Sequence, residues 1–149
     1  MKRRNLLLLF PGLVLATGSS RSQSSAPVIA VFKTPTCSCC GKWVQHLKSN
    51  GFSVKVQEVN DTAPYQRQYR VPRQLQSCHT AVVNAYTIEG HVPAAEIKRL
   101  LNERPKVVGL AVSGMPQGSP GMESARTEPY SVMSFDEAGR TSVYARYPR

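Results

Sequence analysis

The sequence predicts an α/β fold, with a mixed β-sheet, flanking helices and a C-terminal β-hairpin. Two observations lead to this class. An apolar run at 28–32, a helical pattern at 39–50 and alternating apolar residues at 52–56 give the order strand, helix, strand. Two short β-rich runs at 80–83 and 86–88 then precede another helical pattern. A βαβ unit followed by a hairpin and a helix combines parallel and antiparallel strand pairs in one sheet.

The first three elements carry their own boundary signals. The run at 28–32 is apolar throughout, as in a strand that is buried on both faces. In the helix that follows, Trp43 and Leu47 lie one turn apart and therefore share a face. Asn50 and Gly51 form a typical helix stop before the next strand.

The middle of the chain predicts a short helix, a hairpin and a longer helix. Pro64 suits the first turn of a short helix over 64–70, where its missing N–H has no cost. The turn of the hairpin falls at 84–85. Pro93 opens the longer helix and Pro105 ends it.

The tail predicts a second hairpin beyond the last helix. The apolar segment 107–112 fits a strand or a buried loop, and 113–122 is a loop rich in Gly and Pro. Alternating residues around 130–132 and 143–147, joined through 136–139, form the C-terminal β-hairpin. Before this extension the element order is β-α-β, short helix, β-β-α, which is the order of a thioredoxin-like fold.

The first 18 residues have the layout of a secretory signal peptide. A basic start precedes an apolar run at 6–16, and small polar residues follow, with cleavage expected after Gly18. Arg3 and Arg4 also resemble a twin-arginine signal, so the Sec and twin-arginine routes both stay open. The apolar run is shorter than the ~20 residues that cross a bilayer, so we expect no stable membrane insertion. The protein is therefore predicted to be periplasmic or otherwise exported.

The remaining chain is predicted to be a Ser-rich linker at 19–27 and one thioredoxin-like domain at 28–149. Its composition, 41% hydrophobic and 19% charged residues, is that of a globular protein. The formal net charge of +10 falls to +7 without residues 1–18, and the remaining cations are scattered. A solvated basic surface explains them better than a nucleic-acid site, so no nucleic-acid partner is expected.

Three of the four cysteines, Cys37, Cys39 and Cys40, lie at the turn between the first strand and the first helix. A helix N-terminus stabilises thiolate, the form of cysteine that binds metals and attacks disulfides. Adjacent cysteines form only strained bridges, so the crowding is predicted to disfavour ordinary pairing. The cluster therefore favours a metal site or thiol exchange over a structural disulfide.

The fourth cysteine, Cys78, precedes His79 at the start of the predicted strand 80–83. In a thioredoxin-like sheet this strand runs antiparallel to the first strand. Its beginning then lies beside the end of the first strand, so Cys78 and His79 are predicted to meet the cysteines of 37–40. This proximity is the central structural prediction of the sequence.

Three kinds of chemistry fit these thiols. Soft thiolates select Cu(I), zinc or iron–sulfur clusters, and several thiolates can bridge more than one Cu(I) ion. We rank copper first. A thiol–disulfide oxidoreductase that uses Cys37 and Cys40 is the second reading. A zinc site is the third, because the Cys-x-Cys-Cys spacing departs from the usual spacing of zinc cysteines.

Other side chains are candidates to complete the site. His79 is expected either to bind the metal or to orient Cys78 through its ring. Met115 is the preferred thioether ligand, because it lies in a Gly/Pro loop rather than in a core, and Met122 closes the same loop. His91 is interpreted mainly as a turn or capping residue and is a weak candidate for a metal ligand. His46 is interpreted as a surface or packing residue.

Four motifs occur in order along the chain and together resemble one family. They are Cys37-x-Cys39-Cys40-Gly41-x-Trp43, Ser77-Cys78-His79-Thr80-Ala81, Ile88-Glu89-Gly90-His91-Val92-Pro93 and Gly114-Met115-Pro116-x-Gly118-Ser119-Pro120-Gly121-Met122-Glu123. The family is that of the CopG-type periplasmic copper-resistance proteins, long described as a domain of unknown function. The resemblance extends from residue 28 to the C-terminus and weakens after Glu123. Ser113 is a departure, because the family often has proline there.

The resemblance implies a thioredoxin-like fold that holds a cysteine-bridged, multinuclear copper cluster. Carried over by position, the bridging thiolates are Cys37, Cys39, Cys40 and Cys78. The implied role is copper resistance by interconversion of Cu(I) and Cu(II). We separately expect copper ions as partners, together with a copper efflux system or a periplasmic electron carrier. A redox-inactive copper carrier fits the same residues, so enzymatic activity as a copper oxidoreductase stays open.

Overall fold

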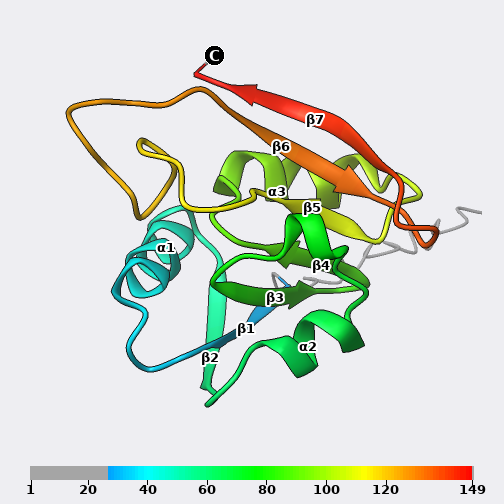
Figure 1. Ribbon diagram of the computed structural model, residues 1–149, viewed down its shortest axis with the longest axis horizontal. Helices are drawn as coiled ribbons and strands as arrows, with labels where there is room; N and C mark the ends of the chain where they lie inside the picture. The colour runs from blue at the N-terminus through cyan, green and yellow to red at the C-terminus, as the bar shows by residue number, and fades with distance from the viewer. Residues whose placement is uncertain (1–26, 149) are drawn as a thin grey trace, which may run out of the picture.

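The computed structural model describes residues 27–148, which form one seven-stranded mixed sheet with helices on both faces (Figure 1). The strand order is β2-β1-β3-β4-β5-β6-β7. The elements in chain order are β1 (Val28–Lys33), α1 (Ser38–Ser49), β2 (Ser53–Glu58), α2 (Ala63–Gln68), the 3-10 helix η1 (Arg73–Leu75), β3 (His79–Val83), β4 (Tyr86–Glu89), α3 (Ala94–Glu103), β5 (Gly109–Ala111), β6 (Tyr130–Phe135) and β7 (Thr141–Tyr147). The predicted signal peptide 1–18 and nearly all of the predicted linker 19–27 lie outside the described residues.

The predicted thioredoxin-like order is confirmed. β1 pairs with β2 in parallel and with β3 in antiparallel fashion, and the second pairing places Lys33 opposite His79. The end of β1 and the beginning of β3 therefore lie side by side. This arrangement brings the loop before α1 next to the loop before β3.

The two predicted hairpins are also present. β3 and β4 are joined through Asn84, whose φ of +52° is of the left-handed kind that Asn tolerates in tight turns. The segment 107–112, for which a strand and a buried loop were both open, contains the short strand β5, parallel to β4. β6 pairs with β5 and β7 pairs with β6, so the C-terminal hairpin extends the sheet on that side.

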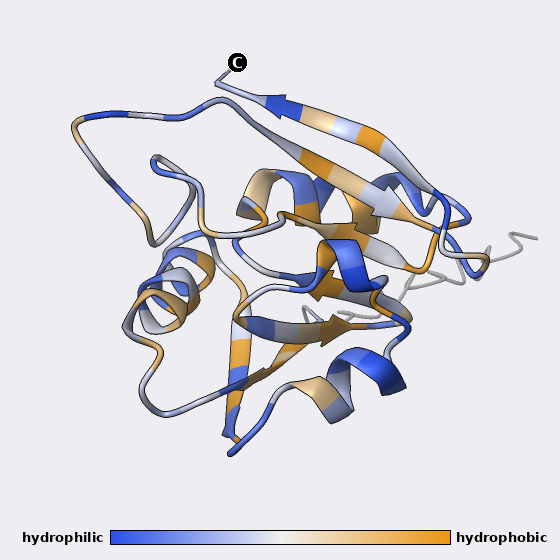
Figure 2. Ribbon diagram, in the orientation of Figure 1, coloured by the Kyte–Doolittle hydropathy of each residue, from blue (hydrophilic) through white to orange (hydrophobic). Residues whose placement is uncertain are grey.

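The alternation of side chains along the strands builds a different core on each face. On one face, α1 and α3 cover the strands, and Trp43, Leu47 and Ile97 pack against Ile29 and Ala81. The opposite face is covered by α2 and η1 and has a smaller apolar cluster. Figure 2 shows the apolar residues concentrated on the central strands, while the end of α2 and the outer turns are polar.

The C-terminal hairpin is fastened to α3 as well as to β5. The Tyr147 hydroxyl donates a hydrogen bond of 2.6 Å to the buried carboxylate of Glu96, and Tyr147 stacks on Tyr130. The guanidinium of Arg99 lies over the ring of Tyr144. Within residues 27–148, none of the helices combines the length and the apolar character that a membrane crossing requires.

Candidate metal centre

The crowded cysteines lie at the N-terminus of α1, and two of them are joined. Cys37 is the N-cap residue of α1, and its sulfur forms a disulfide with that of Cys40, which is fully buried. The expectation that crowding disfavours ordinary pairing is therefore wrong for these two residues. Positions three apart in the first turn place their Cα atoms 5.4 Å apart, within the normal range for a disulfide, whereas adjacent positions do not.

Cys39 stays free and lies beside a thioether. Its sulfur is 3.5 Å from that of Cys37 and 3.4 Å from the Sδ atom of Met115. Met115 lies in the loop between β5 and β6, and 48% of its surface is exposed. The contact brings the preferred thioether to the cysteines, at the solvent-facing side of the cluster.

The predicted approach of Cys78 is confirmed. The Cys40 sulfur is 3.8 Å from the carbonyl oxygen of Cys78, and the four sulfur atoms all lie within 4.8 Å of one another. The pairing of β1 with β3 produces this approach, since it places the two loops at one edge of the sheet. Reduction of the Cys37–Cys40 disulfide would leave four thiols at one place.

Two imidazoles also lie beside the sulfur of Cys78. The Nδ1 atom of His79 is 3.4 Å and the Nε2 atom of His91 is 3.3 Å from the Cys78 sulfur. These three residues form a second group whose potential ligand atoms lie within 4.8 Å of one another. Cys78 is common to the thiol group and to the imidazole group.

The fully buried ring of His91 lies beside Cys78, although the sequence indicated mainly a turn or capping role for it. The pairing register of the predicted hairpin was enough to predict that His91 lies next to Cys78. The β3–β4 hairpin pairs Thr80 with Glu89, so the residues two positions beyond each end, Cys78 and His91, continue along the same pairing. Residues that face each other across a hairpin are close neighbours.

Burial controls the protonation of these groups. It lowers the pKa of His79 to about 3, helped by the neighbouring ring of His91, and it also lowers the pKa of His91. Both rings are therefore neutral at neutral pH, the form in which imidazole binds metals. Burial raises the pKa of Cys78 to about 11, so this sulfur carries a proton until a cation replaces it.

Two side chains of α1, Trp43 and His46, contact His79 and the start of α3, respectively. The Trp43 ring packs on His79 with ring centroids 4.3 Å apart, and its Nε1–H donates to the carbonyl of Val92. His46 accepts a hydrogen bond of 3.0 Å from the backbone N–H of Ala94 at the start of α3. These contacts agree with the packing roles that the sequence indicates.

The loop that contains Met115 is held against the site at several points. The Ser77 hydroxyl donates to the carbonyl of Gly114 over 2.9 Å. Gly121, with φ of +90°, lies so close to α1 that a Cβ atom there would be 2.7 Å from the carbonyl oxygen of Cys39. Met122 is half-buried, and within residues 27–148 its sulfur makes no hydrogen-bond contact with the cysteines.

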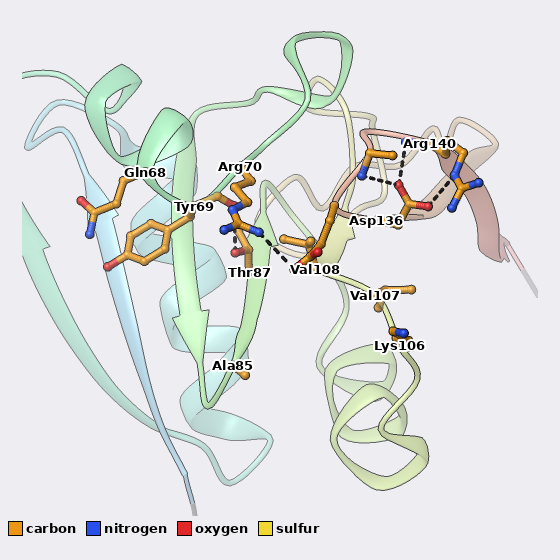
Figure 3. A pocket seen from close by; sticks show the side chains of 12 residues that line it. Gln68, Tyr69, Arg70, Ala85, Thr87, Lys106, Val107, Val108, Asp136 and Arg140 are labelled. Carbon is orange, nitrogen blue, oxygen red and sulfur yellow. Dashed lines mark hydrogen bonds and ion pairs between the residues drawn. The ribbon is translucent and has the colours of Figure 1, made fainter.

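A cavity of about 700 Å³ lies away from the cysteines, at the opposite end of β4 (Figure 3). It is lined by residues near Thr87 and by the β6–β7 turn. Two of its three cations, Arg70 and Arg140, are paired with Glu137 and Asp136, and the third is Lys106. Neither a cysteine nor a histidine is among its lining residues, so it does not contribute to the cysteine site.

The donors of the site determine which cations it suits. Sulfur and neutral imidazole are soft or intermediate ligands and prefer copper or zinc to magnesium or calcium. The two ligand groups in the described part of the chain contain no carboxylate, the donor that hard cations need. The residues therefore fit copper by their chemistry, once the disulfide is reduced.

Comparisons with known proteins agree with this chemistry. The model of a family described as a protein of unknown function, DUF411, matches residues 75–122, which include Cys78, His91 and Met115. Among curated proteins, none matches. Two solved structures, copper resistance protein CopG in form 1 and in form 2, match with TM-scores of 0.79 and are each 42% identical to this chain. The two matches cover 84% and 83% of this chain, respectively, and the whole length of each solved chain. On this evidence, the chain belongs to the CopG family of copper resistance proteins.

Proposed function

We propose that this protein binds copper through its clustered cysteines and acts in copper resistance. The four thiolates of Cys37, Cys39, Cys40 and Cys78 would hold Cu(I) ions in a multinuclear, sulfur-bridged site. His79, His91 and Met115 would complete the coordination. The observation that carries the proposal is the convergence of four sulfurs and two neutral imidazoles at one edge of the sheet.

Cys78 has a special place in this proposal because both ligand groups contain it. A thiolate can bind more than one soft metal ion, so its sulfur is suited to bridge an ion held by thiolates and an ion held by imidazoles. Its neighbours in the two groups come from α1, from β3 and from the segment after β4. Copper binding would therefore join three separate parts of the chain.

We further propose that the site interconverts Cu(I) and Cu(II). The Cys37–Cys40 pair supports this, because a dithiol releases two electrons and two protons when it closes into a disulfide. Two electrons reduce two Cu(II) ions to two Cu(I) ions, so the step balances without another reductant. The copper-resistance names of the two related structures fit this role.

Copper analysis of the reduced protein tests the binding proposal. The protein is reduced, loaded with Cu(I) without oxygen and desalted, and copper, zinc and thiols are then counted per chain. We expect more than one copper per chain, and fewer in Cys78→Ser. Zinc alone, or no metal, would contradict the proposal.

Two methionines of one loop provide a matched pair of variants. Met115→Leu removes the thioether that lies beside Cys39, whereas Met122→Leu removes one that makes no such contact. We expect weaker Cu(I) retention against a soluble chelator in Met115→Leu only. Equal retention in the two variants would remove Met115 from the proposed ligands.

The redox proposal has its own measurement. The reduced, metal-free protein is mixed with Cu(II) without oxygen, and Cu(I) is followed with a colour-forming chelator while disulfide is counted. We expect two Cu(I) for each disulfide formed. Full Cu(II) retention without loss of thiols would leave a redox-inactive carrier.

A thiol–disulfide oxidoreductase is the second candidate, and the Cys37–Cys40 disulfide favours it directly. Cys37 is the half-buried partner of a fully buried Cys40, so a substrate would reach Cys37 first. This function needs no metal. Insulin reduction by the metal-free protein would support it, and activity that appears only with copper would exclude it.

The proposed place of action is outside the cytoplasm, in keeping with the signal-peptide pattern of residues 1–18. A copper efflux system or a periplasmic electron carrier is the proposed partner. Fractionation of cells that produce the full chain tests the location. Recovery of the uncleaved chain from the cytoplasm would contradict it.

A further inference from the structure

A buried glutamate lies next to the metal centre but outside both ligand groups. Glu89 is the last residue of β4, and its side chain is fully buried. Because side chains alternate along a strand, Glu89 faces α2, whereas its neighbour Ile88 faces the core under α1 and α3. The proposed copper chemistry does not use this carboxyl group.

The carboxyl group of Glu89 holds the chain on both sides of Cys78 and His79. Its Oε1 atom accepts hydrogen bonds from the backbone N–H of Ser77 over 2.7 Å and from Nε2 of Gln66 over 2.8 Å. Its Oε2 atom accepts one from the Thr80 hydroxyl over 2.7 Å. Ser77 comes directly before the pair of ligand residues and Thr80 directly after it.

Gln66 of α2 makes this arrangement tighter. Its amide also donates to the carbonyl oxygen of Ser77 over 3.0 Å, so the N–H and the C=O of Ser77 are both fixed by buried side chains. Gly90 adds close packing, since a Cβ atom there would be 2.9 Å from the Cβ atom of Ser77. The backbone that precedes Cys78 has little freedom to move.

A purely structural explanation accounts poorly for a carboxyl group at this position. Burying one is costly, and an apolar residue would fill the space under α2 with less desolvation. Desolvation raises the pKa of Glu89 to about 7, although its three hydrogen bonds oppose the shift. The hydrogen bonds suit both protonation states, because the Thr80 hydroxyl can donate or accept.

We propose that Glu89 is a positioning residue that fixes the Ser77–Thr80 backbone, so that the Cys78 sulfur and the His79 ring converge on the copper site. The inference rests on the proposed copper binding. It assigns Glu89 no contact with copper. The role is geometric, so it depends on hydrogen bonds and not on charge.

Three variants separate position, charge and stability. Glu89→Ala removes all the hydrogen bonds of the carboxyl group. Glu89→Gln keeps an oxygen for Ser77 and Gln66, and its amide N–H can donate to the hydroxyl of Thr80. Glu96→Ala is the matched control, because Glu96 is also fully buried but lies in α3 under the C-terminal hairpin.

Cu(I) affinity by chelator competition is the first measurement, made on reduced protein whose urea unfolding is recorded in parallel. We expect Glu89→Ala to bind Cu(I) about 10- to 100-fold more weakly, the range for residues that support metal ligands. Glu89→Gln should stay within about threefold of the wild type, and so should Glu96→Ala even if it unfolds more easily. Equal affinities of Glu89→Ala and Glu96→Ala, or a Glu89→Gln as weak as Glu89→Ala, would overturn the proposal.

The second measurement needs no copper and separates this proposal from the proposed function. In the metal-free protein with the Cys37–Cys40 disulfide intact, the alkylation rate of Cys78 is followed by peptide mass spectrometry. We expect faster alkylation in Glu89→Ala and an unchanged rate in Glu89→Gln and Glu96→Ala. If the wild type binds no copper, the proposed function fails while this rate still tests the position of Cys78.

Gln66→Leu covers the case in which Glu89→Ala does not fold. It removes the two hydrogen bonds of the Gln66 amide but keeps the carboxyl group of Glu89. We expect faster alkylation of Cys78 here too. A rate equal to that of the wild type in a folded Gln66→Leu would count against the proposal.

Discussion

Substitution of Gly121 by alanine tests how the Met115 loop packs against α1, next to the cysteine cluster. The Cβ atom of alanine would lie 2.7 Å from the carbonyl oxygen of Cys39 and 2.9 Å from the backbone nitrogen of Trp43. Both atoms belong to the backbone of α1 and cannot rotate away. The variant must either strain this contact or lift the loop, and with it Met115, off the helix.

The magnitude follows from a matched variant elsewhere. Gly121 and Gly139 have φ of +90° and +75°, but a Cβ atom at Gly139 would meet nothing within 4 Å. Both alanines carry the left-handed penalty of about 1–2 kcal/mol. Only Gly121→Ala adds an overpacking cost of about 1–3 kcal/mol. Its urea midpoint should therefore lie roughly 1 M below that of Gly139→Ala.

Two assays cover the two possible responses. Urea unfolding, followed by the fluorescence of Trp43, detects a strained loop through a lower midpoint. Alkylation of Cys39 detects a lifted loop, because loss of the contact with Met115 would expose the Cys39 sulfur. The described contact would be refuted by a Gly121→Ala variant that has the same urea midpoint as Gly139→Ala and the same alkylation rate of Cys39 as the wild type.

Three more predictions concern the surroundings of the site. Because Trp43 is the single tryptophan and its ring is 4.3 Å from that of His79, Cu(I) titration should quench the fluorescence, and an unquenched signal at full loading would argue against copper at His79. Burial raises the pKa of Glu89 from 4.5 to about 7, so the native state binds its proton more tightly. Ionisation of Glu89 should by itself lower the free energy of unfolding of the metal-free protein by roughly 3 kcal/mol from pH 4.5 to 7. The lowered pKa of His79 acts in the opposite direction over this range, so the quantity to measure is the difference between the wild type and Glu89→Gln in urea titrations. A difference that does not change with pH would contradict this assignment. His46→Ala leaves the buried N–H of Ala94 without its partner, which should cost about 1–3 kcal/mol in urea unfolding while copper per chain stays unchanged; a loss of copper would show that His46 does more than pack.

The fold was predictable because its strands and helices carry local signals that agree with one another. The apolar run of β1, the stop at Gly51 and the turn at Asn84 each fixed a boundary to within one or two residues. The segment at β5 stayed ambiguous, because three apolar residues suit a strand and a buried loop equally well. Its pairing with β4 and β6, which sequence alone does not reveal, decides the matter.

The position of a residue in the site was predictable where strand topology alone determines it. It was less predictable where side-chain packing determines it. The approach of Cys78 follows from the direction of β3. His91 was within reach, because the hairpin register aligns it with Cys78. The contacts of Glu89 were not predictable, because its burial depends on how α2 lies over the sheet. No local pattern of residues encodes the position of α2.

The hairpin of β6 and β7 has a consequence for the methionine loop. Because β6 pairs with β5, the stretch from 112 to 129 is closed at both ends by the sheet, and Met115 is not part of a dangling tail. A closed stretch samples far fewer conformations than a free end, so less entropy is lost when the thioether settles beside Cys39. By closing this stretch, the C-terminal hairpin restricts the conformations of Met115, the side chain that lies beside Cys39.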